Sequence, residues 1–289
     1  MNSKKISALA NAKINLQLDV LNKRADGYHN ISSIFQSVTL ADEITVTVLN
    51  GSSISVTTSG AIIEGENLVE KAAELFLEHI KTQAEINIYL KKIIPLSAGV
   101  GGGSSDAAAV LLCLNKVFSN PLSESELLEL GLKLGADVPF CIIGGTALVE
   151  GIGEKLTPLD YIGDYDVVLV KQHKKASTGE MYSRIDSLTI PAQANSDAIF
   201  KNIKNKFKNC VPQISHNSFL YASYDKSEQE KICKLLLKNG AVLAGLSGSG
   251  PTVFGLFKNI NKIFAEALKN QYKEVYICKT APQGIKIIE

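Results

Sequence analysis

The sequence predicts an α+β protein, because of the kinds of segment it contains and the order in which they follow one another. Segments in which apolar and polar residues alternate are typical of half-buried strands, and they lie at 12–20, 34–38, 43–49, 53–57 and 85–90. Helical segments are interspersed with them, beginning at 67–81, where apolar residues recur at helical spacing. The strict strand–helix–strand order of a doubly wound sheet is absent, which favours an α+β architecture.

Local signals mark the next elements of the first half. An Asp-Gly pair at 26–27 turns the chain after the first strand. A glycine-rich loop at 95–105 precedes a buried helix at 107–118, which Ser104 or Ser105 could cap.

A Ser-x-x-Glu capping box at 123–126 opens a further helix, which Gly135 closes. We expect the apolar run that follows residues 136–140 to form a strand that ends at the glycine pair 144–145, and another strand at 147–150.

A short polar segment at 160–164 suggests a domain change, with one unit at 1–159 and a second at 160–289. In the second unit the predicted strands are 167–170, 252–257 and 274–279, and the predicted helices are 178–186, 197–206, 227–239 and 262–271. A compact glycine–serine loop at 246–251 leads into the strand that follows it.

The composition argues against several classes of partner. The chain has 289 residues, 45% of them hydrophobic and 20% charged, and a net charge of +1, so nothing favours nucleic acid or a membrane surface. No apolar run approaches the roughly 20 residues that span a bilayer, and the start of the chain lacks the apolar stretch of a secretory signal. Five scattered cysteines without a CxxC pair fit a reducing cytoplasm better than a disulfide framework or structural zinc.

Residues 95–105 (Pro-Leu-Ser-Ala-Gly-Val-Gly-Gly-Gly-Ser-Ser) are the most informative part of the sequence. Glycine adopts positive φ without steric cost, so such a loop could turn its backbone N–H groups inward. The helix that follows adds free N–H groups and a dipole that attract an anion. We therefore interpret the loop as a phosphate cradle, and the alternative is a flexible surface turn.

The loop matches neither of two common nucleotide-binding motifs. A Walker A loop needs a lysine after its last glycine, where Ser104 stands. A dinucleotide-binding fingerprint counted from Gly99 also reaches Ser104 where it needs glycine. A hydrolase is not indicated either, because the stretch at 245–249 ends on serine where a nucleophile elbow has glycine.

Lys13 and Asp137 stand out only once phosphoryl transfer is considered. Taken alone, Lys13 is better explained as part of a solvated strand face, and Asp137 as a turn or capping residue. Phosphoryl transfer, however, needs a cation near the migrating charge and a carboxylate that accepts the hydroxyl proton. Tyr28 and His29 could equally be a packed aromatic and a surface histidine, and the loop at 246–251 could be a tight strand entry or a second phosphate contact.

Four blocks of sequence together resemble the GHMP small-molecule kinases. The blocks are 12–16 (Ala-Lys-Ile-Asn-Leu) with 26–29 (Asp-Gly-Tyr-His), 95–109, 134–140 (Leu-Gly-Ala-Asp-Val-Pro-Phe) and 246–254 (Leu-Ser-Gly-Ser-Gly-Pro-Thr-Val-Phe). They span nearly the whole chain in the family's order. The glycine loop is shared by homoserine, mevalonate and galactose kinases, whereas the blocks around Lys13, Tyr28 and Asp137 narrow the match to one branch of the superfamily.

The resemblance implies both a fold and a reaction. An N-terminal ATP-binding domain would resemble domain 2 of ribosomal protein S5, the C-terminal domain would be ferredoxin-like, and the substrate would lie between them. ATP would phosphorylate the 2-hydroxyl of 4-diphosphocytidyl-2-C-methyl-D-erythritol, in non-mevalonate isoprenoid precursor biosynthesis, giving ADP and the 2-phosphate. Mg²⁺ is expected as in other phosphoryl transfers; no carboxylate declares itself as its ligand, and Ser104 or Ser105 is a candidate by position.

The resemblance also implies roles for single residues. Asp137 would be the catalytic base, while Lys13 would keep that carboxylate charged, orient the hydroxyl and offset charge on the γ-phosphate. The implied ATP contacts are Pro95, Ala98, Gly99, Val100, Gly101, Gly102, Gly103, Ser104 and Ser105. The implied substrate contacts are Asn15, Tyr28, His29, Thr178, Tyr182, Ser249 and Gly250. An aromatic ring among them would stack on cytosine, and the backbone of His29 would read the edge of the base.

Two departures from the family pattern and two alternative functions stay open. Asn217-Ser218 stands where the family commonly has Asn-Asp, and Val100 replaces the commoner leucine. The alternatives are a kinase of the same superfamily for homoserine, mevalonate or a sugar, and a nucleotide-binding sensor without catalysis. The Asp-Gly-Tyr-His block argues against the first, and the presence of both Lys13 and Asp137 against the second. A monomer and a weak homodimer are equally compatible with the sequence.

Overall fold

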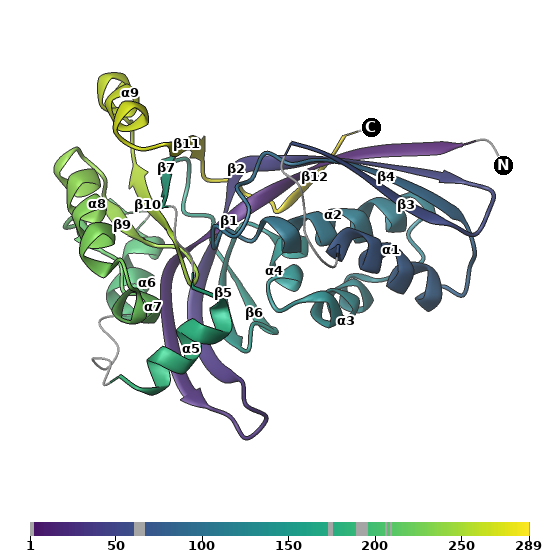
Figure 1. The fold of residues 1–289 in the computed structure, drawn as a ribbon, viewed down its shortest axis with the longest axis horizontal. Coiled ribbons are helices and arrows are strands. Elements are labelled where there is room, and N and C mark those ends of the chain that lie inside the picture. Colours follow the sequence, from purple (N-terminus) through teal and green to yellow (C-terminus); the bar gives the residue numbers. More distant parts are fainter. Residues whose placement is uncertain are drawn as a thin grey trace.

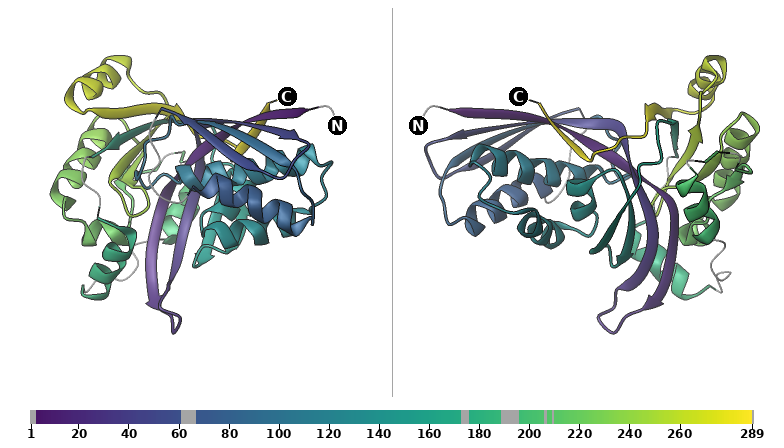
Figure 2. Two further views of the ribbon diagram at one scale, coloured as in Figure 1. Left: turned by 45° about the vertical axis from the view of Figure 1, so that its right-hand side comes forward. Right: turned by 180° about the vertical axis from the view of Figure 1, so that it is seen from behind.

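The computed structural model describes residues 3–60, 67–172, 176–188, 196–205, 207–208 and 210–288. In this part of the chain the strands assemble into two separate sheets, each with helices packed against it (Figures 1 and 2). Strands and helices follow one another without a regular repeat. The α+β prediction is confirmed.

The first sheet combines the N-terminal strands with one strand from the C-terminal end. Its strands run in the order β12-β1-β2-β4-β3, with β5 paired to β2 and β6 paired to β5. Their bounds are β1 Lys4–Lys23, β2 His29–Leu49, β3 Ile54–Ser59, β4 Glu85–Lys91, β5 Thr146–Gly151, β6 Lys155–Leu159 and β12 Ile285–Ile288. The helices against this sheet are α1 Leu68–His79, α2 Gly102–Val117, α3 Glu124–Leu134 and α4 Val138–Ile143. Sheet and helices enclose one continuous apolar core.

The second sheet is built from the later part of the chain, in the order β11-β7-β10-β9-β8. Its strands are β7 Asp166–Lys171, β8 Gln213–Ile214, β9 Leu243–Leu246, β10 Thr252–Phe257 and β11 Glu274–Lys279. The helices of this half are α5 Thr178–Asp186, α6 Ser196–Lys204, α7 Ser218–Ala222, α8 Lys226–Lys238 and α9 Lys262–Gln271. The central strand β10 is buried along its whole length, as its unbroken apolar sequence requires.

Strands β1 and β2 form a long hairpin (Figure 1). The end of the hairpin that carries its turn extends beyond the other strands of the first sheet and contacts α5 of the second half. The sequence predicts a shorter first strand at 12–20 and two strands between 34 and 49, whereas the structure has one strand in each place. The register shifts between Asn11 and Lys13 and again after Asn15, which marks bulges that re-aim side chains. The middle of β1 is buried on both faces, so the solvated-face interpretation of Lys13 is wrong.

Two local predictions are also wrong. The apolar run that ends at the glycine pair 144–145 belongs to the helix α4 rather than to a strand, since Pro139 lies in the first turn of α4, where the fixed φ of proline suits a helix. Helix α2 begins at Gly102, ahead of both serines predicted to cap it. Gly101 takes the capping position in a left-handed conformation, which a residue with a Cβ rarely adopts. The glycine loop itself therefore starts the helix.

The last strand returns to the first half of the molecule, where β12 pairs with β1. Ile288, at the end of β12, consequently lies beside Ser7, near the start of β1. The proposed division into 1–159 and 160–289 stays a prediction. Strand β12 belongs to the second of these parts by sequence but pairs with β1 in the first. No helix in the described part of the chain is both long and apolar enough to cross a membrane.

Candidate active site

A cavity of about 460 Å³ lies between the two halves of the molecule. Its wall includes these predicted functional residues: Lys13, Asn15, Tyr28, Pro95, Ala98, Gly99, Val100, Gly101, Gly102, Gly103, Ser104, Asp137, Thr178, Tyr182 and Ser249. A larger cavity, of about 700 Å³, lies within the second half and has neither Lys13 nor the glycine loop on its wall. Segments far apart in the sequence thus meet in the smaller cavity.

The glycine loop passes over β1 and against the second glycine–serine loop. Val100 accepts a 2.9 Å hydrogen bond from the backbone N–H of Lys13. A Cβ on Gly101 would come within 2.9 Å of the Lys13 side chain, and one on Gly99 would collide with the carbonyl oxygen of Ser247. Both glycines also have positive φ, of 72° and 76°. Glycine is therefore required at both positions for the two loops and the lysine to meet.

Helix α2 presents its N-terminus to the cavity. Residues 102–104 line the wall, and backbone N–H groups in the first turn of a helix have no partner within it. Such groups bind anions, and the helix dipole adds to the attraction. Ser105 is different, since its buried hydroxyl donates to the carbonyl oxygen of Asn11 at 2.7 Å and its N–H to that of Gly101. The structure does not bring the predicted contact at Ser105 to the cavity.

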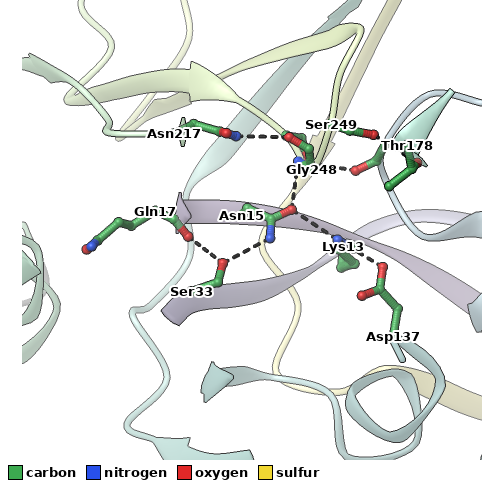
Figure 3. Close-up of polar contacts among 11 residues, drawn as sticks. Lys13, Asn15, Gln17, Ser33, Asp137, Thr178, Asn217, Gly248 and Ser249 are labelled. Carbon is green, nitrogen blue, oxygen red and sulfur yellow. Dashed lines mark hydrogen bonds and ion pairs between the residues drawn. The ribbon is translucent and has the colours of Figure 1, made fainter. Parts of the chain in front are cut away.

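Lys13 and Asp137 form an ion pair on the cavity wall, with Lys13 Nζ 3.1 Å from Asp137 Oδ2 (Figure 3). The lysine side chain is 5% exposed and the aspartate side chain 34% exposed. The ammonium group is thus fixed inside the protein, whereas the carboxylate faces open space. Asp137 occupies the N-cap position of α4 but makes no side-chain capping bond. Its carboxylate remains available to accept a proton from a group that enters the cavity.

Asn15 connects this ion pair to the second loop (Figure 3). Its Oδ1 accepts hydrogen bonds from Lys13 Nζ at 3.0 Å and from the N–H of Gly248 at 2.8 Å. Its Nδ2 donates to Ser33 Oγ at 3.0 Å. Lys13 Nζ also lies 4.2 Å from the centre of the Phe35 ring. A carboxylate, an amide oxygen and a ring face therefore replace the water that the buried ammonium group has lost.

Asn217 and Ser218 make hydrogen bonds to the second glycine–serine loop and to β1, respectively. Asn217 Nδ2 donates to the carbonyl oxygens of Leu246 and Gly248, at 2.8 Å and 3.0 Å. Ser218 Oγ accepts the backbone N–H of Val20 at 2.9 Å. The serine that departs from the family pattern thus keeps a polar role, as a hydrogen-bond acceptor for β1.

Aromatic and hydroxyl side chains form the side of the cavity away from the glycine loop. Tyr28, next to the turn of the hairpin, is 62% exposed, while Tyr182 comes from α5 and is partly buried. Burial, together with the charge of Asp137, raises the pKa of Tyr182 to about 12, so its hydroxyl stays neutral. Thr178 and Ser249 share a 3.2 Å hydrogen bond across this side (Figure 3). This side offers flat rings and neutral hydrogen-bonding groups.

Two predicted substrate contacts do not reach the wall. The ring of His29 lies behind that of Tyr182, with the ring centres 4.8 Å apart and the planes 14° from parallel. Gly250 completes the second loop, where its N–H donates to the carbonyl oxygen of Ser247 at 2.9 Å. Its φ of 81° suits that turn.

The sequence predictions missed a buried ionic cluster beneath the glycine loop. Lys92 Nζ lies 2.5 Å from Asp42 Oδ2 and 2.7 Å from Asp106 Oδ2. Asp42 also accepts the backbone N–H groups of Ile93 and Ile94. Burial, opposed by Lys92 and reinforced by Asp42, raises the pKa of Asp106 to about 8. The cluster joins β2, the end of β4 and the first turns of α2, which together frame the loop.

Comparison with known proteins identifies the family of the chain. The family described as "GHMP kinases N terminal domain" matches residues 67–145, and "GHMP kinases C terminal" matches residues 201–274. The 4-diphosphocytidyl-2-C-methyl-D-erythritol kinase of Clostridioides difficile (strain 630) is 39% identical, over 96% of this chain and 95% of its own. The kinase of the same name from Clostridium botulinum (strain Alaska E43 / Type E3) is 41% identical, over 94% of this chain and 98% of its own.

Solved structures give the same relationship. A crystal structure of 4-(cytidine 5'-diphospho)-2C-methyl-D-erythritol kinase superposes with a TM-score of 0.79 and 31% identity, covering 95% of this chain and 99% of the other. The homoserine kinase of Cytophaga hutchinsonii ATCC 33406 has a TM-score of 0.70 but only 18% identity, over 98% of this chain and 97% of its own, and so shares the fold alone. The chain belongs to the 4-diphosphocytidyl-2-C-methyl-D-erythritol kinase family of the GHMP kinases.

Proposed function

We propose that this protein transfers the γ-phosphoryl group of ATP to the 2-hydroxyl of 4-diphosphocytidyl-2-C-methyl-D-erythritol, in non-mevalonate isoprenoid precursor biosynthesis. The observation that carries the proposal is the ion pair of Lys13 and Asp137 beside a glycine loop and a helix N-terminus. The choice of acceptor follows the relatives named for it. Homoserine, mevalonate and sugar kinases are not favoured, because the matches to the first two share only the fold.

Asp137 and Lys13 divide the chemical work. Asp137 takes the proton of the 2-hydroxyl while the hydroxyl oxygen bonds to the γ-phosphorus, and the bond from that phosphorus to the bridging oxygen of ADP breaks. Lys13 is held in place by its ion pair with Asp137 and its hydrogen bond to Asn15, so its Nζ stays beside the reacting groups. Its ammonium group offsets the negative charge that moves from ATP to the acceptor.

The glycine loop and the start of α2 would bind the triphosphate through backbone N–H groups. In the described residues no three metal-binding side chains gather, so a magnesium ion would be held chiefly by phosphate oxygens and water. Ser104, on the wall at the α2 N-terminus, is the hydroxyl that we expect to join it. When bound, the ion would neutralise part of the charge on the β- and γ-phosphates.

Tyr28 and Tyr182 would hold the cytosine of the acceptor, and Asn15, Thr178 and Ser249 would contact its polar groups. The two rings lie on the same cavity wall, and stacking on a pyrimidine suits their flat faces. We further propose a cytoplasmic location, because all five cysteines are free thiols, which a reducing compartment maintains.

Phosphorus NMR of the protein with ATP, Mg²⁺ and the cytidylyl acceptor tests the proposal. We expect a new phosphomonoester signal to grow as ADP appears. Homoserine, mevalonate and galactose, each offered in place of the acceptor, should give no such signal. ATP binding without ADP release for any of these acceptors would instead support the nucleotide sensor and overturn the kinase.

A further inference from the structure

Asp186 joins two distant segments beside the acceptor side of the cavity. Its Oδ1 lies 2.6 Å from His29 Nε2, and its Oδ2 lies 2.6 Å from Lys23 Nζ. Lys23 ends β1, His29 begins β2, and Asp186 is the last residue of α5. One carboxylate therefore fastens the end of the hairpin to a helix of the second half.

The contact with His29 extends to the cavity wall through Tyr182. The ring of His29 covers one face of the Tyr182 ring, and Phe219 meets Tyr182 at 4.9 Å with the planes 78° apart. Tyr182 and Phe219 both line the cavity. With His29 stacked on one face and Phe219 packed against it, the Tyr182 ring is held in one orientation on the cavity wall.

We infer that Asp186 is a positioning residue for the acceptor: it holds His29 against Tyr182 and so keeps the tyrosine ring in place as a flat wall for an aromatic base. The inference rests on the proposed function, because it assigns the base of the acceptor to that wall. Asp186 is not itself on the wall, so it acts through the two rings.

The two partners of Asp186 differ in solvent exposure, and this difference makes the inference specific. The side chains of Lys23 and Asp186 are 55% and 33% exposed, so water and salt screen the bond between them. The side chain of His29 is 5% exposed, and its contact with the carboxylate is sheltered. The bond to His29 should therefore carry the positioning, and Lys23 should matter little.

Steady-state kinetics of Asp186→Asn, Asp186→Ala and Lys23→Met test the inference. Both Asp186 variants should raise the KM for the cytidylyl acceptor about tenfold, while kcat and the KM for ATP stay within about twofold. Lys23→Met should change none of these values by more than about twofold. A merely structural role would instead lower the melting temperature and raise both KM values together.

Glu274→Gln is the matched control, because it removes the charge that pairs with Lys171 at 3.0 Å, and the Glu274 side chain is 28% exposed, close to the 33% of Asp186. Glu274 lies on β11 and is not on the cavity wall, so this variant should leave both KM values unchanged. An acceptor KM that is unchanged in Asp186→Ala, or raised equally in Glu274→Gln, overturns the inference.

Proton NMR of the histidine rings gives a readout that does not depend on activity. The chain has four histidines, and the ring CH signals of His29 should be shifted upfield by the Tyr182 ring stacked on it. The signal that disappears in His29→Gln is assigned to His29. In Asp186→Ala this signal should move toward the chemical shifts of the other three histidines. An unmoved signal overturns the inference. Failure of the wild-type protein to phosphorylate the cytidylyl acceptor would overturn the proposed function, while this signal would still report whether Asp186 holds the ring.

Discussion

The two sides of the cavity are built from different groups. On the phosphate side, the glycine loop and the first turn of α2 line the cavity, and the buried cluster of Asp42, Lys92 and Asp106 lies beside them. On the acceptor side, the rings of Tyr28 and Tyr182 face the cavity, and the partly exposed Asp186 supports one of them. The phosphate side is therefore mainly backbone that a buried ionic cluster supports, whereas the acceptor side is mainly side chains that a partly exposed carboxylate supports.

The difference follows from what each side would bind. A triphosphate presents the same charge to every kinase, so backbone groups and a helix dipole suffice, provided that a rigid support holds them. An acceptor is recognised by its particular rings and hydroxyls, which requires side chains. Substitutions on the phosphate side should therefore cost stability, whereas those on the acceptor side should cost acceptor affinity alone.

Asp137→Asn should have the largest effect, because Asp137 lies where the two sides meet. The amide keeps the size of the carboxylate but cannot accept a proton, so kcat should fall about a thousandfold or more. Both KM values and the melting temperature should stay near those of the wild-type protein. A coupled assay of ADP release measures the rate, and retention of more than about a tenth of kcat would remove Asp137 as the base.

Lys92→Met tests whether the phosphate side depends on its buried support. The variant leaves the buried Asp42 carboxylate and the buried Asp106 carboxyl group without the ammonium group that pairs with them, so the free energy of unfolding should fall by about 3 kcal/mol or more. Lys91→Met is the control, because Lys91 is the adjacent lysine and pairs with Glu43 at the surface, at 2.9 Å. Urea unfolding should show a large loss for the first variant and almost none for the second. Equal losses would mean that the cluster is no special support.

Asp106→Asn should change the pH dependence of stability. The pKa of Asp106 is raised by burial to about 8, so the folded protein holds a proton that the unfolded chain releases near pH 4. The stabilising contribution is complete below the unfolded pKa and is lost as pH rises through about 8. Asparagine cannot ionise, so urea midpoints should decline less between pH 6 and pH 9 in the variant. Parallel declines in the two proteins would contradict the raised pKa.

Tyr28→Ala should have the smallest effect and should separate the two sides most clearly. Tyr28 is 62% exposed, so its loss should leave the melting temperature unchanged. The KM for the acceptor should rise about tenfold, because one stacking face is lost, while the KM for ATP stays constant. A rise in the KM for ATP of similar size would show that the two sides are not independent.

Elements with strong local signals were predictable. The capping box at Ser123 and Glu126 and the helix that it opens are present as expected. The helix α4 was not predicted, because a short apolar run ahead of two glycines suits a strand equally well, and packing against α2 and α3 decides the matter. The single strand β2 was missed for a similar reason, since no local signal shows that a sheet continues across residues 39–42.

The candidate site was predictable in its residue types but not in its support. Lys92 and Asp106 flank the glycine loop in apolar surroundings, and this pair of charges is a signal that could have been weighed. Asp42 gives no such signal, because it meets Lys92 only where β2 pairs with β4. Asp186 likewise acts across more than a hundred residues of sequence.

The sequence by itself determined the glycine loop, the family and the two side chains that we propose carry the chemistry, because these depend on residue type and on short-range sequence motifs. Only the tertiary structure decided that the Lys13 ammonium group is buried against Asp137, that Ser105 faces the core, and that a charged cluster lies under the loop. A contact between distant residues depends on the burial and pairing that the whole fold imposes, and no local pattern encodes it.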